Sequence, residues 1–425
     1  MKKFMRCVAL TTLAILAGLG HSIAAGFMVR ENSAMAVGTT YAGAGSRAEA
    51  AETAFANPAG LTRLSGAEVE SGAVVILPSV EFRGGASVFG TPIPGGNGGS
   101  VGRSAMVPNL YWAFGITDRL KGGIAVTAPF GNGTQYDSTW AGRYLGIKTS
   151  AFVADINPNI AFRLNDALSV GGGISAQYLK VDVSSAIAQF IIFGPGAPDA
   201  FFRFKADDWA FGFNLGVLWQ PEDGTRIGLT YRSGIDHRSK GTLDFTGASP
   251  LLGVVSGAAS AKVRLPGTIG VSVTREVGPN LSLSADVQFT QWGVFKQVII
   301  ESQNPPFVNE EQYRDSWLIA LGGAYRLDQR WSLMAGLAWD QTPVTERFRA
   351  VSLPDSDRYL AGLGARYRLT EAVTLEGAYQ HSFAFSHASM NSSSNNTDPF
   401  THAVVLHGIY RVDVNLFALS ARYKY

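Results

Sequence analysis

LSLSADVQFT, residues 281–290, alternates apolar and polar residues without a break. Successive side chains of a β-strand point to opposite faces, so this period of two predicts a strand with one apolar face. Its length is about that of a tilted strand crossing a bilayer. The alternation recurs in residues 226–232, 331–340 and 359–369. We therefore expect an all-β protein built from long strands.

Aromatic residues mark the ends of several of these segments, where a membrane barrel carries its interface girdles. They are Trp219, Tyr231, Trp292, Trp331 and Trp339. The segments are also longer than the strands usual in a soluble sandwich. Both features favour a transmembrane barrel, although a soluble β-protein with its apolar face turned inward would alternate in the same way.

The connections predict the number of strands. Tight polar turns are expected at Thr117–Arg119, Asn165–Asp166, Glu222–Gly224, Gly278–Asn280, Asp328–Gln329 and Thr370–Glu371. Longer links are expected at Gly84–Ser104, Gly131–Ser150, Ser184–Lys205, Ser239–Ala261, Glu301–Gln312, Thr342–Ser356 and Ser386–Phe400. Short and long connections alternate, as the periplasmic turns and extracellular loops of outer-membrane barrels do.

Six turns and seven loops join fourteen antiparallel strands. A further turn at Arg411–Asp413 would make fifteen, but bacterial single-chain barrels have even counts. We therefore interpret His402–Tyr425 as one long final strand.

The first residues indicate export. Lys2, Lys3 and Arg6 precede an apolar run and a small-residue site, which together are typical of a signal peptide over residues 1–24. The apolar run is shorter than the roughly 20 residues of a spanning helix. The only cysteine, Cys7, lies in this segment, so we expect no disulfide in the mature chain. These features predict the outer membrane of a Gram-negative bacterium.

The composition excludes several other classes. Charged residues make up 16% of the chain, which is below the roughly 25% usual in soluble proteins, and glycine is abundant. The formal net charge of +2 gives no basis for a nucleic-acid partner. No stretch after the signal is long and apolar enough for a spanning helix.

A barrel of this width needs something inside it. Residues 25–64 lack strand alternation, are rich in Ala and Gly, and include Arg47–Phe55, which we predict to be a short helix. We expect this segment to be an N-terminal hatch, or plug, within the lumen, and residues 65–425 to form the barrel. A periplasmic tail is the alternative.

The chain resembles the long-chain fatty-acid outer-membrane transporter family (FadL-type). The resemblance rests on segments that keep the family's order along the chain. They are Ala25–Phe27, Tyr41–Gly45, Asn57–Ala59, Asp208–Asn214, Leu229–Ser233, Arg314–Trp317, Asp340–Val344 and Leu353–Arg358. It implies a fourteen-strand barrel with an N-terminal hatch and passive uptake of hydrophobic compounds. In the family, outer loops catch ligand, the hatch holds it, and it leaves sideways near a kink in the third strand.

The resemblance also implies roles for individual residues. Phe27 is similar to the hatch aromatic that touches ligand, and Arg314 to a basic contact for a carboxylate. The triplet Asn57, Pro58 and Ala59 resembles the hatch motif that abuts the kinked strand, and Gly131 and Gly133 fall where that kink is expected. A second basic contact is expected near Ser185 on the fifth strand. The sequence has none there, and Lys180 is out of register, so neutral aromatic hydrocarbons stay open as ligands.

One loop is unusually apolar. We interpret its side chains as an outer capture site, because a large exposed apolar patch usually marks a binding surface. They are Phe190, Ile191, Ile192, Phe193, Phe201 and Phe202. Packing between loops is the alternative interpretation.

The sequence does not favour an enzyme. Its histidines at 381, 387, 402 and 407 lack convergent metal-ligand spacing, and no G-x-S-x-G motif is present. We expect no metal and no cofactor. The prediction is a monomer whose partners are hydrophobic small molecules and outer-membrane lipid. A general aqueous porin is the main rival, but an open pore needs neither hatch nor apolar loop.

Overall fold

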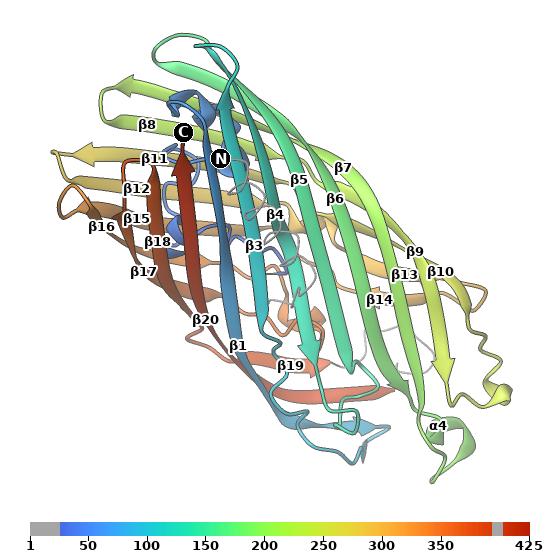
Figure 1. Cartoon of the computed structure of the whole chain (residues 1–425). Helices are drawn as coiled ribbons and strands as arrows, with labels where there is room; N and C mark the ends of the chain where they lie inside the picture. The colour runs from blue at the N-terminus through green and yellow to red at the C-terminus, as the bar shows by residue number, and fades with distance from the viewer. Residues whose placement is uncertain (1–25, 393–402) are drawn as a thin grey trace.

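The computed structural model describes residues 26–392 and 403–425, and it forms a single antiparallel sheet that closes into a barrel (Figure 1). The expected signal peptide, residues 1–24, lies outside the described residues. The sheet closes because the first strand pairs with the last, from Glu68 opposite Lys424 to Val88 opposite Val404. Closure leaves no exposed edge, which a sheet in a membrane cannot tolerate.

Nine of the wall strands are each a single element of the sheet. They are β1 (Glu68–Val88), β3 (Ala105–Gly115), β4 (Leu120–Gln135), β5 (Lys148–Arg163), β6 (Leu168–Ile187), β7 (Ala200–Glu222), β16 (Trp331–Asp340), β17 (Arg358–Arg368) and β20 (Val404–Lys424). The short strand β2 (Thr91–Pro92) folds back on the end of β1.

Five further wall strands each consist of two pieces that share at least one neighbouring wall strand. They are β8 with β9 (Thr225–Arg232, Ile235–Thr246), β11 with β10 (Thr268–Val277, Gly257–Leu265), β12 with β13 (Leu281–Thr290, Gln297–Glu301), β15 with β14 (Ser316–Arg326, Phe307–Glu310) and β18 with β19 (Val373–Phe383, Ala388–Ser392). Joining the pieces gives fourteen strands, so the predicted count is confirmed.

All six tight turns fall where the sequence predicts them, and the last strand is continuous through Arg411–Asp413. Several predicted loops are too long. β4 continues to Gln135, β6 to Ile187, and β7 already begins at Ala200. Beyond the bilayer neither face of a strand must be apolar, so the alternation fades there although the strands stay paired.

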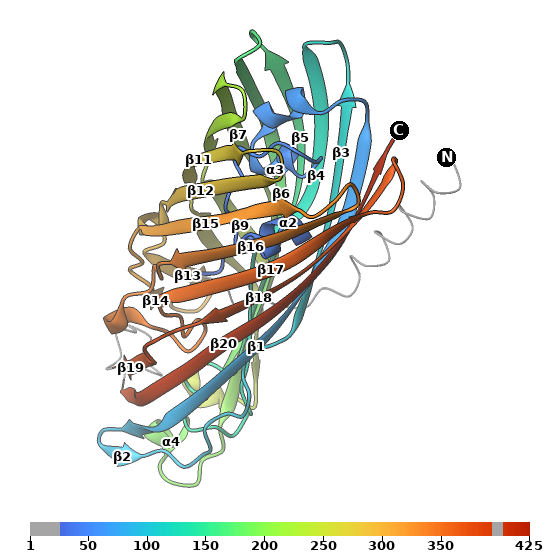
Figure 2. The same ribbon diagram turned by 90° about the vertical axis from the view of Figure 1, so that its left-hand side faces the viewer.

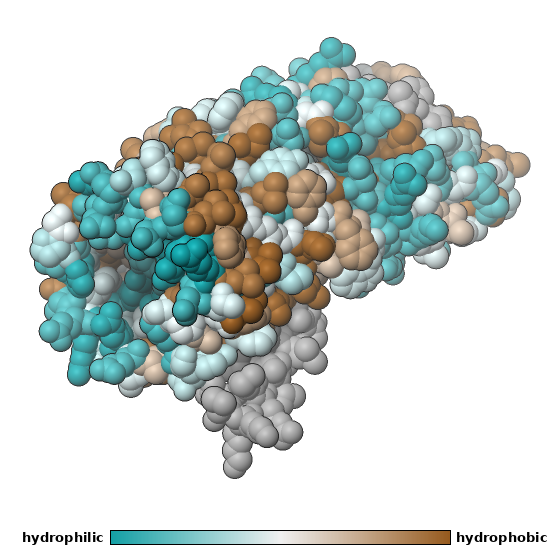
Figure 3. Space-filling model, turned by 90° about the horizontal axis from the view of Figure 1, so that it is seen from above, coloured by the Kyte–Doolittle hydropathy of each residue, from teal (hydrophilic) through white to brown (hydrophobic). Residues whose placement is uncertain are grey.

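The direction of the alternation identifies the barrel as a membrane protein. In β12, Leu283 is 48% exposed whereas Ser284 is 6% exposed, so the apolar face points outward. Figure 3 shows hydrophobic side chains gathered across the middle of one face, with hydrophilic side chains to either side. A soluble sandwich buries its apolar face, and this barrel presents it to the surroundings.

The N-terminal segment, residues 26–64, lies inside the barrel (Figures 1 and 2). Its elements α2 (Ala34–Gly38), α3 (Thr53–Ala56) and η2 (Pro58–Arg63) pack against strands on different sides of the wall. Wall glycines admit its backbone. A Cβ on Gly336 would lie 2.2 Å from the Thr39 carbonyl oxygen, and one on Gly362 would lie 2.5 Å from that of Val37.

The helix predicted over Arg47–Phe55 is wrong in extent, because only Thr53–Ala56 is α-helical. Ala48 adopts a left-handed backbone conformation with φ of 51°, which a right-handed helix cannot include. The remaining short helices are α4 (Phe190–Phe193), η3 (Pro250–Leu252), η4 (Trp292–Val294) and η5 (Glu346–Phe348). Within the described part of the chain, no helix has both the length and the apolar character needed to span a bilayer.

Candidate ligand-binding site

The third wall strand, β4, is interrupted. Its register against β5 shifts between Thr127 and Phe130, so Ala128 and Pro129 form a bulge. Pro129 has no N–H to donate to a neighbouring strand, which is why proline in a sheet is confined to such irregular positions. The resemblance places the kink at Gly131 and Gly133, but the residue that breaks the ladder is Pro129. Sequence analysis missed it, although a proline within a strand was the signal.

On its other side, β4 loses its partner strand. Pairing with β3 ends where Val126 lies opposite Leu110. The segment that leads from β2 to β3 contacts β4 again at Gly133, whose carbonyl accepts the Arg103 N–H at 3.3 Å. The N-terminal segment covers the interval between them. The Val29 N–H donates to the Pro129 carbonyl at 2.8 Å, and the Gly131 N–H donates to the Phe27 carbonyl at 2.8 Å.

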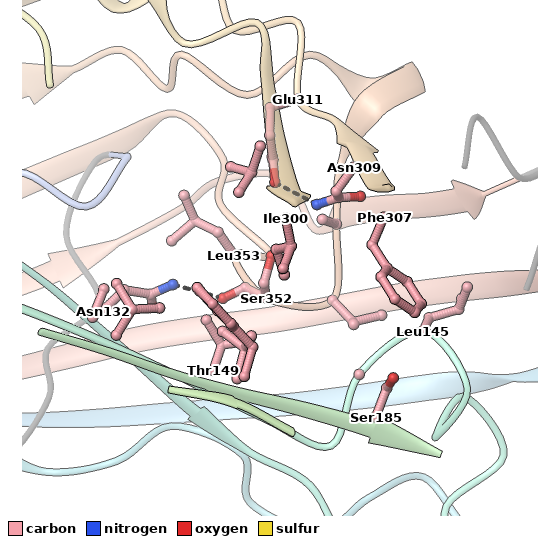
Figure 4. A pocket seen from close by; sticks show the side chains of 18 of the residues that line it. Asn132, Leu145, Thr149, Ser185, Ile300, Phe307, Asn309, Glu311, Ser352 and Leu353 are labelled. Atoms are coloured by element: carbon pink, nitrogen blue, oxygen red, sulfur yellow. Dashed lines mark hydrogen bonds between the residues drawn. The ribbon is translucent and has the colours of Figure 1, made fainter. Parts of the chain in front are cut away.

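A cavity of about 310 Å³ opens beside this break, and Figure 4 shows some of the side chains that line it. Its walls come from β5, β6, β7, β10, β13 and β14, and from the connection between β16 and β17. Most of its lining is apolar. The large apolar side chains are Leu145, Leu179, Val181, Phe202, Phe204, Val263, Ile300, Phe307 and Leu353.

Phe27 forms the boundary between the cavity and the N-terminal segment. Its ring lies 4.7 Å from that of Trp292, 5.3 Å from Phe295 and 5.9 Å from Phe130, measured between centroids. The same residue lines the cavity and bonds to Gly131 through its carbonyl. A ligand that displaced Phe27 would therefore act on the break in the wall.

The cavity also has a few charged side chains. Lys148, Glu310, Glu311, Arg347 and Arg349 line it. Lys148 lies opposite Ser184 in the β5–β6 pairing, so a cation is present on the strand next to the one that carries Ser185. Sequence analysis sought this cation on the fifth strand alone and missed it, because pairing across strands could not be read from spacing along one strand.

Other predicted residues lie elsewhere. Arg314 is not among the side chains that line the cavity. Its guanidinium donates to the Thr342 carbonyl at 3.3 Å and lies 3.8 Å from Asp357. The geometry thus gives Arg314 protein partners outside the cavity.

The apolar loop is divided. Phe190–Phe193 forms the outer helix α4, where the Phe190 ring packs 5.9 Å from Tyr144. The sequence predicts Phe201 and Phe202 in the loop, but they lie in β7, because the pairing of β7 with β6 and β9 extends that far. Phe202 is 9% exposed and faces the cavity, whereas Phe201 is 39% exposed and is not part of the lining.

Asn57, Pro58 and Ala59 do not contact Gly131. The Asn57 Nδ2 donates to the carbonyls of Gly45 (2.7 Å) and Val217 (3.0 Å), and its Oδ1 accepts the Ala59 N–H at 3.1 Å. The triplet therefore fastens the N-terminal segment to β7. The expected contact with the kink is made by Phe27 and Val29 instead, since their backbones lie alongside β4.

Buried ion pairs hold the start of the N-terminal segment. Asp340 lies 3.2 Å from Arg30 and 3.0 Å from Arg358, and the Gly26 N–H donates to Asp355 at 2.9 Å. Breaking a buried pair by removing one partner leaves an uncompensated charge, which is strongly destabilising. These contacts hold the backbone on both sides of Phe27 in place.

The chain is similar to known outer-membrane proteins along nearly its whole length. Residues 15–425 match the family model described as outer membrane protein transport protein (OMPP1/FadL/TodX). A long-chain fatty acid transport protein of Escherichia coli O6:H1 is 28% identical over 390 residues, which cover 84% of this chain and 87% of that protein. A 47 kDa outer membrane protein of Pasteurella multocida is 26% identical, with 100% and 99% of the two chains covered.

Solved structures agree with the fold. The crystal structure of a Pseudomonas aeruginosa FadL homologue superposes with a TM-score of 0.87 at 25% identity, covering 94% of this chain and 99% of that one. The toluene transporter TodX of Pseudomonas putida, at 14% identity and a TM-score of 0.65, covers 93% and 98% and shares the fold.

We predict that Asn57→Ala loosens the N-terminal segment while the barrel still assembles. Asn57 makes three hydrogen bonds, two of them buried, and leaving buried partners unsatisfied costs about 1–3 kcal/mol. Ligand uptake and heat-modifiability on gels should be measured in the same membranes. The expected result is reduced uptake with normal heat-modifiability. Loss of both would make the triplet a folding element, and normal uptake would make it an ordinary turn.

Proposed function

The chain belongs to the OMPP1/FadL/TodX family of outer membrane transport proteins, and from this premise we propose that it takes up hydrophobic molecules passively, with long-chain fatty acids as its first candidate ligands. It acts in this proposal as a monomeric channel, not as an enzyme. One observation carries the proposal. An apolar cavity lies beside a break in the wall, and Phe27 borders both.

Apolar contact supplies the affinity in this mechanism. Burying an alkyl chain contributes roughly 0.8 kcal/mol per methylene, so a long chain gains on the order of 10 kcal/mol before ordering costs. The cavity wall of leucine, isoleucine, valine and phenylalanine side chains suits such a ligand. No energy source is needed, because the ligand moves down its own gradient.

The direction of release follows from the break in β4. The lumen below the cavity is filled by the N-terminal segment, whereas, within the described part of the chain, residues 27–29 cover the interval between Val126 and Gly133. We therefore assign the exit to a sideways path past Phe27 and Gly131 into the membrane. A general aqueous porin does not fit a lumen filled in this way.

Lys148 is the cation that we propose for a carboxylate head group. It already pairs with Asp182, which is also bound by Arg203 at 2.8 Å, so two cations share one acid and the cluster keeps a net positive charge. The family resemblance implies this role for Arg314, but its partners are Thr342 and Asp357. Because Lys148 is partly neutralised, neutral aromatic hydrocarbons stay the second candidate ligands.

Two charge-removing variants separate these residues. Lys148→Met should reduce uptake of oleate several-fold more than uptake of toluene, because only oleate offers a carboxylate. Arg314→Met, the matched control outside the cavity, should affect neither ligand selectively. Labelled uptake by a deletion strain carrying each variant measures both. The reverse pattern would return the carboxylate contact to Arg314.

Neighbouring phenylalanines test the cavity itself. Phe202→Ser should weaken uptake at low ligand concentration about tenfold or more, since it replaces a large apolar contact of the ligand by a hydroxyl. Phe201→Ser alters the next residue of the same strand, which lies outside the cavity lining, and should transport normally. If both variants took up oleate and toluene as well as the unmodified protein does, the assignment of the cavity as the binding site would be contradicted.

A further inference from the structure

Glu311 is an acid enclosed in the apolar cavity. It lies in the segment between β14 and β15, is 5% exposed, and is held by its backbone N–H, which donates to the Lys296 carbonyl at 2.9 Å. Figure 4 shows its side chain reaching from this segment toward the other cavity residues. Phe295 and Tyr313, whose rings are 4.9 Å apart, also line the cavity.

The carboxyl group is only half satisfied. Its Oε1 accepts the Asn309 Nδ2–H at 2.7 Å, the Tyr313 hydroxyl lies beside the carboxyl group, and Oε2 has no hydrogen-bond partner of good geometry among the described residues. Buried polar atoms in native proteins nearly always have a partner, so an unpaired one in a ligand cavity points to a partner on the ligand.

The nearby cations are engaged elsewhere. Lys296 donates to the Tyr313 carbonyl at 3.3 Å, Arg349 bonds to the carbonyls of Asp355 and Ser389, and Lys148 pairs with Asp182. No described cation lies within ion-pairing distance of Glu311. Burial raises the pKa of Glu311 to about 8, and the Tyr313 hydroxyl offsets only part of that effect. At neutral pH the group is therefore mainly the uncharged acid, which both donates and accepts.

We propose that Glu311 makes the cavity select ligands that carry a hydroxyl group on an apolar skeleton. A hydroxyl can donate to Oε2 and accept from the acid, whereas a hydrocarbon would bury Oε2 without a partner. A site built to bond a hydroxyl discriminates strongly against an analogue that lacks it, because the protein's own polar group is then left unpaired. The inference rests on the proposed function, since it concerns the ligand of that same cavity.

The hydroxyl could be the head of a long-chain alcohol or a substituent along a fatty-acid chain. Four probes distinguish these sources: hexadecane, 1-hexadecanol, hexadecanoate and 10-hydroxyhexadecanoate. Their dissociation constants would be measured by calorimetry on the full-length protein in detergent, for the unmodified protein and for Glu311→Leu, Glu311→Gln and Glu301→Gln. Glu301 is an exposed acid at the end of β13 outside the cavity lining and serves as the control.

Glu311→Leu should weaken binding of a hydroxylated probe about tenfold and leave hexadecane unweakened, since one hydrogen bond to the ligand is lost. Glu311→Gln, which keeps a donor and an acceptor, should retain most of the affinity, and Glu301→Gln all of it. Loss confined to 1-hexadecanol assigns the head group, and loss confined to 10-hydroxyhexadecanoate assigns the chain.

Two results would overturn the inference and spare the proposed function. One is an equal change for hexadecane and both hydroxylated probes in Glu311→Leu. The other result concerns the unmodified protein alone. It is that 10-hydroxyhexadecanoate binds about tenfold more weakly than hexadecanoate and that 1-hexadecanol binds no more tightly than hexadecane. Failure of all four probes to bind the unmodified protein would overturn the proposed function and this inference together.

Discussion

The structure depends on one constraint: within a membrane, each backbone N–H and C=O must find its partner inside the protein. The closed ladder from β1 to β20 satisfies it nearly everywhere. One exception is β4 around Pro129, where β3 no longer pairs. The Phe27 carbonyl and the Val29 N–H supply partners there, so the integrity of the wall depends on a segment that is not part of the wall.

This dependence connects binding to release. Phe27 presents its ring to the cavity and its carbonyl to Gly131, while the ion pairs of Arg30 and Asp340 hold the following residues in place. The farther end of the N-terminal segment is fastened separately, through Asn57 to β7. The part of the N-terminal segment near Asn57 is thus held to the wall, while the few residues around Phe27 cover the break. A ligand need move only these few residues to open a path.

The fold was largely predictable because its signal is local. The alternation of residues 281–290 and the six turns specify strand, face and count from neighbouring residues alone. The site was less predictable, because it depends on pairing across strands. Lys148 lies on a different strand from Ser185, and Phe202 and Phe201 differ only in which face of β7 they occupy. Arg314 finds partners 28 residues and more away along the chain. The family resemblance located the kink approximately, but the residue responsible, Pro129, and the segment that covers the break required the three-dimensional arrangement.

A reversible disulfide between the N-terminal segment and β4 tests the lateral route most directly. A Cβ on Gly131 would lie in van der Waals contact with Val29, 3.7 Å from its Cγ2, so cysteines at these two positions would face each other, and Cys7 is the only cysteine in the sequence. The measurement is labelled oleate uptake by cells carrying Val29→Cys with Gly131→Cys, before and after reduction, with each single variant as control. The account predicts that uptake is lost while the disulfide is intact and returns on reduction. Unchanged uptake with the disulfide fully formed would contradict it.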